Sequence, residues 1–149
     1  MSSGSPTPTA PNTKTLITTP SPFESQIGYS RAVISGDLIF VSGCTGYDPQ
    51  THTLPPTILA QTSQALLTIR AALRAAQSDF CDVVRVRYIL PDRRDFSEPV
   101  FTLLREAFGE ARPAATMVVA GLMEEGMLIE IEVTAVRGSG GEGVGRVLL

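Results

Sequence analysis

The chain has 149 residues, of which 18% are charged and 43% are hydrophobic, and its formal net charge is -3. This length favours a single domain with its own hydrophobic core. The acidic balance argues against a protein that binds nucleic acid by neutralising phosphates, and the lack of a long apolar run argues against a membrane protein.

The cysteine content and the N-terminal composition indicate an intracellular protein. Cys44 and Cys81 are the only cysteines, and they form neither a CxxC motif nor a spacing typical of metal ligands, so we expect no metal site. Both thiols are expected to stay reduced, and the first residues lack the features of a secretory signal. The expected location is therefore the cytoplasm.

The N-terminal third favours short strands that follow a disordered arm. Residues 1–15 are rich in Ser, Thr and Pro and offer little to bury, so this segment is expected to be disordered. The segments predicted after it are strands at 16–18, 31–35 and 38–41, a loop at 25–29 and a turn at Gly36-Asp37. The glycine-bearing loop at 42–46 then either approaches a ligand closely or simply turns the chain.

Two amphipathic helices are expected, with a strand between them. Periodic apolar residues predict a helix over 57–77 and a second helix that begins at 97 or 98 and ends at 108. Alternation of apolar and polar residues predicts a strand over 82–90. In that strand Arg85 and Arg87 share one face.

The last ordered segment is predicted to be a β-hairpin. An apolar run over 115–122 and an alternating run over 127–136 flank a turn at 124–126. In the second run Glu130 and Glu132 lie on one face, opposite an apolar face. A carboxylate in this position is either a solvated side chain or part of a functional site.

The predicted order ββαβαββ gives one domain over residues 16–137, with two helices on one face of a sheet. The other face must then be covered by another copy of the chain, and clefts between subunits suit a small molecule. The glycine-rich residues 138–149 lack the strand and helix context of a phosphate-binding loop. We expect a flexible tail there.

These residues resemble the reactive intermediate deaminase family, also called Rid or YjgF, over nearly all of 23–137. The resemblance rests on Gly28-Tyr29, on the run SGCTGYDPQT at 42–51, on Gln61, and above all on PAATMVVAGL joined to IEIEVTA. It implies an α+β fold like that of chorismate mutase, assembled as a homotrimer with ligand clefts between subunits. It also implies cofactor-free hydrolysis of reactive enamines and imines to a keto acid and ammonia.

The chain departs from the deaminating members of this family at its expected substrate site. Those members carry a substrate-clamping arginine directly after Pro-Ala, an asparagine early in the second helix and often a cysteine two residues past the arginine. These positions hold Ala115, Phe101 and Met117 here. The resemblance retains Glu130, which would place the attacking water, and Tyr29, near the cleft. The carboxylate clamp of the family is absent.

Two further side chains are candidates for substrate binding. Arg87 is hypothesised to replace the missing positive charge, and the alternative is a structural ion pair with Glu130 or Glu132. Ser42 offers a hydroxyl that either binds substrate or caps a turn. His52, the single histidine, is expected to be a surface residue.

Three functions remain open on these residues. The first is a Rid-like hydrolase or tautomerase for an imine, an enamine or a related carbonyl compound, with Glu130 as the proton-transfer group. Simple 2-imino acids are expected to be poor substrates, because Ala115 and Phe101 favour a bulkier or uncharged one. The second is a trimer that binds a metabolite or stabilises a partner without turnover. The third, a ribonuclease, is disfavoured by the acidic balance and the single histidine.

Overall fold

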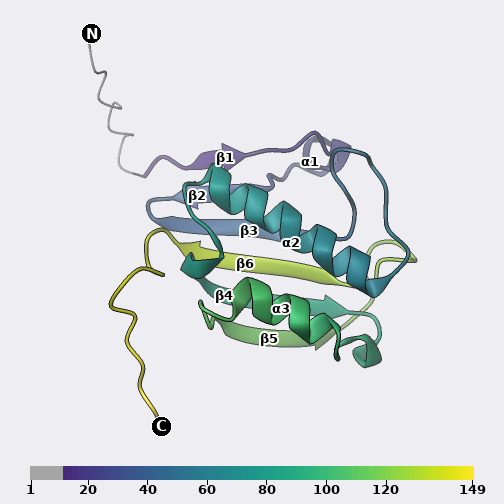
Figure 1. Ribbon diagram of the computed structural model, residues 1–149. Helices are drawn as coiled ribbons and strands as arrows, with labels where there is room; N and C mark the ends of the chain where they lie inside the picture. The colour runs from purple at the N-terminus through teal and green to yellow at the C-terminus, as the bar shows by residue number, and fades with distance from the viewer. Residues whose placement is uncertain (1–11) are drawn as a thin grey trace.

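A computed structural model describes residues 12–149, and Figure 1 shows its elements. The chain forms one six-stranded sheet in the order β1-β2-β3-β6-β4-β5. β4 and β5 run parallel, and the other neighbouring strands are antiparallel. The elements are β1 (Thr15–Ile17), α1 (Pro22–Ile27), β2 (Ala32–Ser35), β3 (Leu38–Thr45), α2 (Ile58–Ala75), η1 (Phe80–Asp82), β4 (Val83–Leu90), η2 (Arg93–Asp95), α3 (Val100–Phe108), β5 (Ala114–Val119) and β6 (Glu130–Val136).

The two longer helices, α2 and α3, cover the same face of the sheet (Figure 1). α2 begins at a capping residue, since the hydroxyl of Thr57 accepts a hydrogen bond from the backbone N–H of Ala60. Its apolar stripe packs on the inward residues of the central strands, and the core between them includes Ile39, Ile69, Leu73, Val86, Ile131 and Val133. The expected α+β architecture with two helices on one face is confirmed.

β5 and β6 do not form the predicted hairpin, because β4 lies between them. Val86 of β4 is opposite Ala115 of β5 on one side and opposite Val133 of β6 on the other. The physical reason is that α3 connects β4 to β5, and a helical crossover brings two strands together in parallel. The segment from 120 to 129 is also longer than a hairpin turn. It crosses the end of β4 and starts the antiparallel strand on the far side.

A short helix replaces part of the loop predicted at 25–29. α1 has Pro22 as its first residue, where the missing N–H of proline costs no helical hydrogen bond. Gly28 ends the helix with a left-handed φ of 87°, and its N–H donates to the carbonyl oxygen of Glu24. This helix covers the end of the sheet at which β3 ends and β6 begins.

The predicted arm is described only in part, and the predicted tail begins in contact with η1. Residues 1–11 of the predicted arm lie outside the described residues, and β1 already begins at Thr15. At the other end, the backbone N–H groups of Gly138 and Gly140 donate to the carboxylate of Asp82 at 3.0 Å and 2.9 Å. The start of the predicted flexible tail is therefore fixed to η1. In the described part of the chain, no helix is long and apolar enough to cross a membrane.

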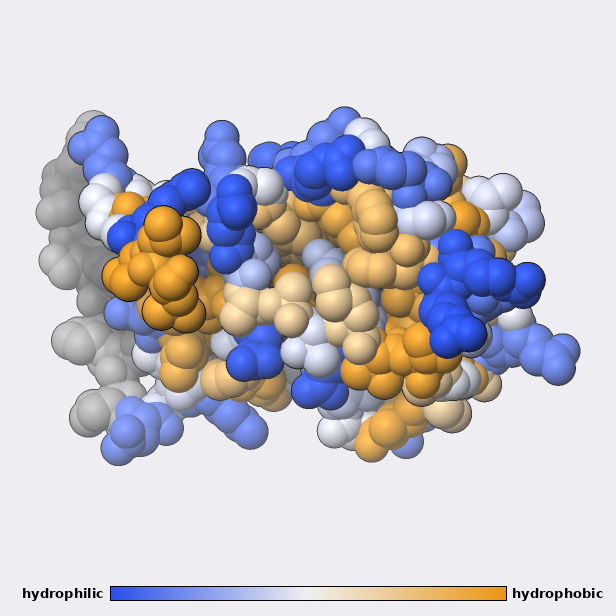
Figure 2. All heavy atoms as spheres, turned by 90° about the horizontal axis from the view of Figure 1, so that it is seen from below, coloured by the Kyte–Doolittle hydropathy of each residue, from blue (hydrophilic) through white to orange (hydrophobic). Residues whose placement is uncertain are grey.

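The sheet face opposite α2 and α3 is open, and so is the outer edge of β5. Leu38 and Phe40 on the open face are 42% and 45% exposed. All six residues of β5 are exposed, and Figure 2, which views this side of the molecule from below, shows apolar residues gathered there. An apolar face of this kind is typical of an interface with another chain.

Candidate functional site

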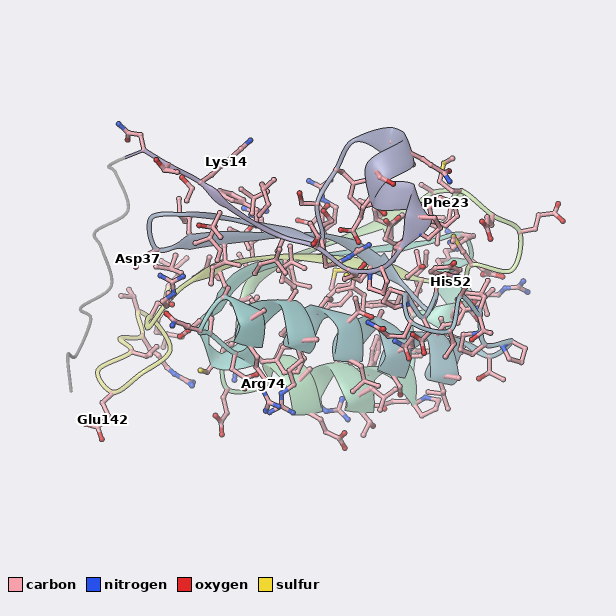
Figure 3. All side chains as sticks on the ribbon, turned by 90° about the horizontal axis from the view of Figure 1, so that it is seen from above. Lys14, Phe23, Asp37, His52, Arg74 and Glu142 are labelled. Atoms are coloured by element: carbon pink, nitrogen blue, oxygen red, sulfur yellow. The ribbon has the colours of Figure 1, made fainter. Side chains whose placement is uncertain are left out.

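A cavity of about 340 Å³ lies at the end of the sheet where β3 ends and β6 begins. α1, the end of β3 and the 123–127 segment form its walls. Figure 3 shows Phe23 and His52 at this end of the molecule, and Asp37 and Glu142 at the other. Its principal lining residues are Phe23, Ile27, Tyr29, Arg31, Gly43, Cys44, Thr45, Tyr47, Met123, Met127 and Glu130.

A larger groove of about 900 Å³ lies between α2 and α3, but its charged side chains are engaged with one another at the surface. Arg70 and Arg74 both pair with Asp79 at 3.2 Å, and all three side chains are substantially exposed. The smaller cavity instead gathers buried ionisable groups. We therefore take the smaller cavity as the candidate site.

Glu130 is held in the cavity wall by its close approach to a glycine. It is the first residue of β6 and lies opposite Thr45 on β3. A Cβ atom at Gly43 would stand 2.8 Å from Cδ of Glu130, so any side chain at position 43 would displace the carboxylate. A bulge in β3 lies at this point, and bulges often redirect side chains beside functional sites.

The surroundings of Glu130 favour its protonated form. Burial raises the pKa of this carboxyl, the charge of Glu132 raises it further, and the charge of Arg31 opposes both effects. A carboxyl with a raised pKa gives up and takes back a proton more readily near neutral pH than an exposed one does. Glu130 can therefore transfer protons in both directions.

Arg31 is a buried cation in the same wall, and sequence reasoning missed it. The side chain precedes β2 and is only 7% exposed. Nη1 donates to the carbonyl oxygen of Gly43 at 3.0 Å and to Sγ of Cys44 at 3.3 Å, and Nη2 donates to the hydroxyl oxygen of Tyr29 at 3.4 Å. The guanidinium carbon lies 5.6 Å from the centre of the Tyr29 ring. Nε is buried and has no hydrogen-bond partner among the described residues.

Cys44 does not have the properties of a nucleophile. Burial raises the pKa of its thiol to about 11, although the nearby charge of Arg31 acts in the opposite direction. The thiol is consequently protonated at neutral pH, and it is the thiolate that attacks carbon. The cavity therefore favours proton transfer by Glu130 over covalent catalysis by Cys44.

Gln61 fixes the segment that closes one side of the cavity. The side chain is fully buried in α2. Its Nε2 donates to the carbonyl oxygens of Pro55 at 2.7 Å and Gly126 at 2.6 Å, and its Oε1 accepts from the N–H of Leu128 at 2.8 Å. One side chain thus positions the backbone between the lining residues Met123 and Glu130.

Three aromatic rings contact one another in a row along the outer side of the cavity. Phe23 meets Tyr47 edge to face with ring centres 5.8 Å apart. Tyr47 stacks on His52 with ring centres 6.0 Å apart. His52 is exposed and is not a lining residue, as expected from the sequence. Phe23 and Tyr47 supply an apolar wall to the cavity.

Of the predicted site residues, Glu130 and Tyr29 line the cavity and Arg87 does not. Nε of Arg87 lies 3.1 Å from Oε1 of Glu132, and both side chains are partly exposed on the open face. Within one chain Arg87 thus forms the ion pair that was the alternative, and its role in a cleft between subunits stays a prediction. The cation nearest the candidate site is Arg31.

The remaining predicted residues lie outside the cavity of their own chain. The hydroxyl of Ser42 donates to the carbonyl oxygen of Ser30 at 2.6 Å, which is a structural role. Phe101 packs edge to face on Phe96 with ring centres 5.0 Å apart. Ala115 and Met117 lie on the exposed edge strand β5. Within residues 12–149, no three His, Cys, Asp or Glu side chains are grouped so that they could hold a metal ion.

Comparison with known proteins identifies the family. Residues 19–137 match the family model described as Endoribonuclease L-PSP. A RutC family protein of Pyrococcus horikoshii is 36% identical over 108 residues, which is 72% of this chain and 85% of that protein. A goat (Capra hircus) protein named 2-iminobutanoate/2-iminopropanoate deaminase is 35% identical over 111 residues, 74% of this chain and 80% of the goat protein.

The fold agrees with these matches. A crystal structure from Mycobacterium tuberculosis, described as a member of the YjgF/YER057c/UK114 family, superposes with a TM-score of 0.74 at 38% identity and covers 83% of this chain and 99% of that one. The residues matched by the family model, 19–137, include α2, α3 and the strands β2 to β6. The chain therefore belongs to the Rid/YjgF/UK114 family.

Proposed function

We propose that this protein is a cofactor-free hydrolase of reactive imines or enamines, with Glu130 as its catalytic residue. The observation that carries the proposal is a carboxyl group with a raised pKa in the wall of an apolar cavity of about 340 Å³. Relatives such as the goat protein are named 2-iminobutanoate/2-iminopropanoate deaminases. Imine hydrolysis is consistent both with a proton-transferring carboxyl group at Glu130 and with the names of these relatives.

The proposed reaction needs one water molecule and one group that moves protons. The imine binds with its nitrogen already protonated. The carboxylate of Glu130 takes a proton from water while the water oxygen bonds to the imine carbon and the electron pair of the C=N π bond moves to nitrogen, which gives a neutral carbinolamine. The proton held by Glu130 then passes to the amine nitrogen of the carbinolamine. The carbon–nitrogen bond breaks while the carbinolamine hydroxyl returns its proton to the Glu130 carboxylate, so a ketone and ammonia form, and ammonia takes that proton and leaves as ammonium. Such general acid–base assistance contributes about 10²–10⁴-fold in rate. An enamine would first be protonated on carbon to give the imine.

The proposed substrate is bulkier than a simple 2-imino acid. Apolar side chains, among them Phe23, Ile27 and Met127, line much of the cavity and would hold a sizeable hydrophobic group. Ala115 and Met117 belong to β5 and cannot reach this cavity within one chain. A role for them in substrate binding requires a neighbouring copy, so we propose a homotrimer whose clefts extend this cavity.

The test is a panel of imines generated in place by an amino-acid oxidase, with release of keto acid followed in time. We expect faster release than in buffer, larger accelerations for bulky apolar side chains than for 2-iminopropanoate, and a loss of about 10²–10⁴-fold in Glu130→Gln. Release at the buffer rate across the panel would contradict catalysis.

A non-catalytic metabolite-binding protein is the second candidate, and the absence of an arginine at Ala115 favours it. The same panel separates the two, because a binding protein would bind keto acids or imines but would not accelerate release. The name of the family model refers to an endoribonuclease. The single histidine, His52, stands outside the cavity lining, so no histidine pair supports that activity. Cys44 and Cys81 are free thiols, which supports a reducing compartment such as the cytoplasm.

A further inference from the structure

Arg31 carries a buried positive charge that forms no ion pair with a described residue, although the charges of Glu24 and Glu130 act on it from farther away. The residue as a whole is 7% exposed. Among residues 12–149, no carboxylate oxygen lies within 4.0 Å of its nitrogens. Buried charges in proteins are usually paired, because an isolated one loses its hydration without compensation. An anion bonded directly to the guanidinium is therefore the partner that this position lacks.

The hydrogen bonds of Arg31 are also incomplete. A guanidinium has five N–H donors, and three of them are used, by Gly43, Cys44 and Tyr29. Nε is buried without a partner. The partners present are a carbonyl oxygen, a thiol and a hydroxyl, which are neutral. They hold the guanidinium in place and leave its charge available.

Arg31 and Glu130 line the same cavity from different elements. Arg31 precedes β2, Glu130 opens β6, and Gly43 of β3 lies between them, since it contacts both side chains. Arg31 also lines a second cavity of about 310 Å³ under β1 and α2. A molecule bound here can thus present an anionic group to Arg31 and a reacting carbon to Glu130.

We propose that Arg31 binds the carboxylate of the substrate and so makes this cavity selective for anionic imines or enamines with a bulky apolar group. The proposal rests on the proposed function for the nature of the substrate. It assigns the positive charge that binds the substrate carboxylate to Arg31, the residue before β2. Arg31 belongs to the same chain that supplies Glu130. The carboxylate would lie under α1 and the apolar group against Phe23 and Met127.

The experiment measures binding without turnover, so that it stands apart from the assay of hydrolysis. Isothermal titration calorimetry at neutral pH compares the 2-keto acid of leucine with its uncharged amide, which has nearly the same shape. We expect the wild-type protein to prefer the acid by about tenfold to a hundredfold, the range for a hydrogen bond between charged groups. Arg31→Gln should abolish the preference by weakening only the acid, and Arg31→Lys should restore part of it.

Three controls make the result decisive. Arg74→Gln removes an exposed arginine of α2 that is paired with Asp79 and should keep the wild-type preference. Arg87→Gln tests the arginine on the open face; loss of the preference there instead of in Arg31→Gln would overturn the proposal. Inorganic phosphate as a competitor separates a carboxylate site from a general anion site, and phosphate binding as tight as that of the acid would overturn selectivity for carboxylates.

If Arg31→Gln fails to fold, the proposal is still tested by comparing acid and amide binding in the wild-type protein and in Arg31→Lys. A wild-type protein that binds acid and amide equally contradicts the role of Arg31 whatever the rates of hydrolysis. A protein that prefers the acid through Arg31 but hydrolyses no imine contradicts the proposed function and leaves this inference intact.

Discussion

Among single residues, Gly43 and Glu130 depend on each other most directly. The glycine leaves the space that the carboxylate occupies, and a Cβ atom there would stand 3.1 Å from Cγ and 2.8 Å from Cδ of Glu130. Neither contact is tolerated without movement. The position of the proposed catalytic group is thus set by the residue that faces it.

Gly43→Ala is predicted to displace the carboxylate of Glu130. We expect imine hydrolysis to fall by about 10²-fold, since a misplacement of about 1 Å has that effect. The free energy of unfolding should fall by less than the ~1–3 kcal/mol typical of an overpacked core, because the atoms that must move are the end of a flexible side chain. Stopped-time keto-acid assays and urea denaturation measure the two effects. Gly121→Ala is the control, because a Cβ there meets open space. In a Glu130→Ala background the stability cost should shrink; an unchanged cost would refute the contact.

The raised pKa of Glu130 predicts how stability depends on pH. Because the folded pKa lies above the unfolded value, protonation of Glu130 favours the folded state below about pH 4.5, and this contribution is lost as the pH rises through the folded pKa. At pH 7.5 the ionised carboxylate therefore destabilises the fold relative to a neutral amide.

Glu130→Gln is consequently predicted to melt above the wild-type protein at pH 7.5, with a difference that declines towards pH 4. Circular dichroism melts at both pH values measure this. Glu125→Gln, an exposed change outside the cavity lining, should alter neither melt. A wild-type protein that melts above Glu130→Gln at pH 7.5 would show that the carboxylate is stabilised by its surroundings, contrary to our account.

The sequence identified some of these residues and missed others for physical reasons. Glu130 was predicted because strand alternation and the family resemblance both single it out. Arg31 was missed because its importance comes from burial under α1, and a six-residue helix with proline at its start leaves little periodicity to read. Arg87 was predicted for the cleft from its face on β4; within one chain the register pairs it with Glu132, and its role between subunits stays a prediction.

On the scale of elements, Gln61 connects α2 to the segment before β6. Its amide bonds three backbone groups at once, two of them in that segment. Buried amides with all partners satisfied fix one arrangement of the chain, since each broken bond leaves a buried group unpaired. The cavity wall that contains Met123 and Met127 therefore depends on α2.

Gln61→Ala is predicted to destabilise the protein by at least about 2 kcal/mol, because it leaves two carbonyl groups and one N–H without partners. Amide hydrogen exchange should accelerate selectively in residues 123–128. Gln64→Ala in the same helix is the matched control, since its side chain makes one longer bond to Thr68 at 3.3 Å. Equal effects of the two substitutions would argue against a special role for Gln61.

Most elements were predictable, and their pairing was less so. The strand periodicity and the α2 and α3 stripes placed the main elements to within a few residues of their bounds. β5 pairs with β4 because α3 connects the two strands in a crossover. That pairing depends on β4, α3 and β5 together, so it could not be predicted from residues 112–137 alone. The turn-like Glu124, Glu125 and Gly126 suggested a hairpin, but in the structure β5 ends at Val119 and β6 begins at Glu130, which leaves a connection longer than a tight hairpin turn.

For the whole molecule, the open face of the sheet is the surface that the proposed trimer would cover. Exposed apolar residues on the face opposite α2 and α3 would meet water in a monomer, and so would the edge of β5. Burial of such surface is the main favourable term in association. A second and third copy would remove it from water and bring Ala115 and Met117 to a neighbour.

Light scattering coupled to gel filtration is predicted to give three times the mass of one chain. Phe40→Asp on the open face should reduce this mass, because it would bury an unpaired charge at the interface. Leu67→Asp, an equally drastic change at an exposed residue of α2, should leave the mass unchanged. A monomeric wild-type protein would contradict the trimer, and with it any role of Ala115 and Met117 in the cleft.

The central place of β6 has a consequence for biosynthesis. Until Glu130–Val136 emerges from the ribosome, β1-β2-β3 and β4-β5 are separate pieces whose inner borders, on β3 and β4, await the same missing strand. Unpaired strand borders recruit other chains. The nascent protein is thus vulnerable to co-translational aggregation until β6 has emerged, and the residue that completes the cavity arrives with the strand that ends this vulnerability.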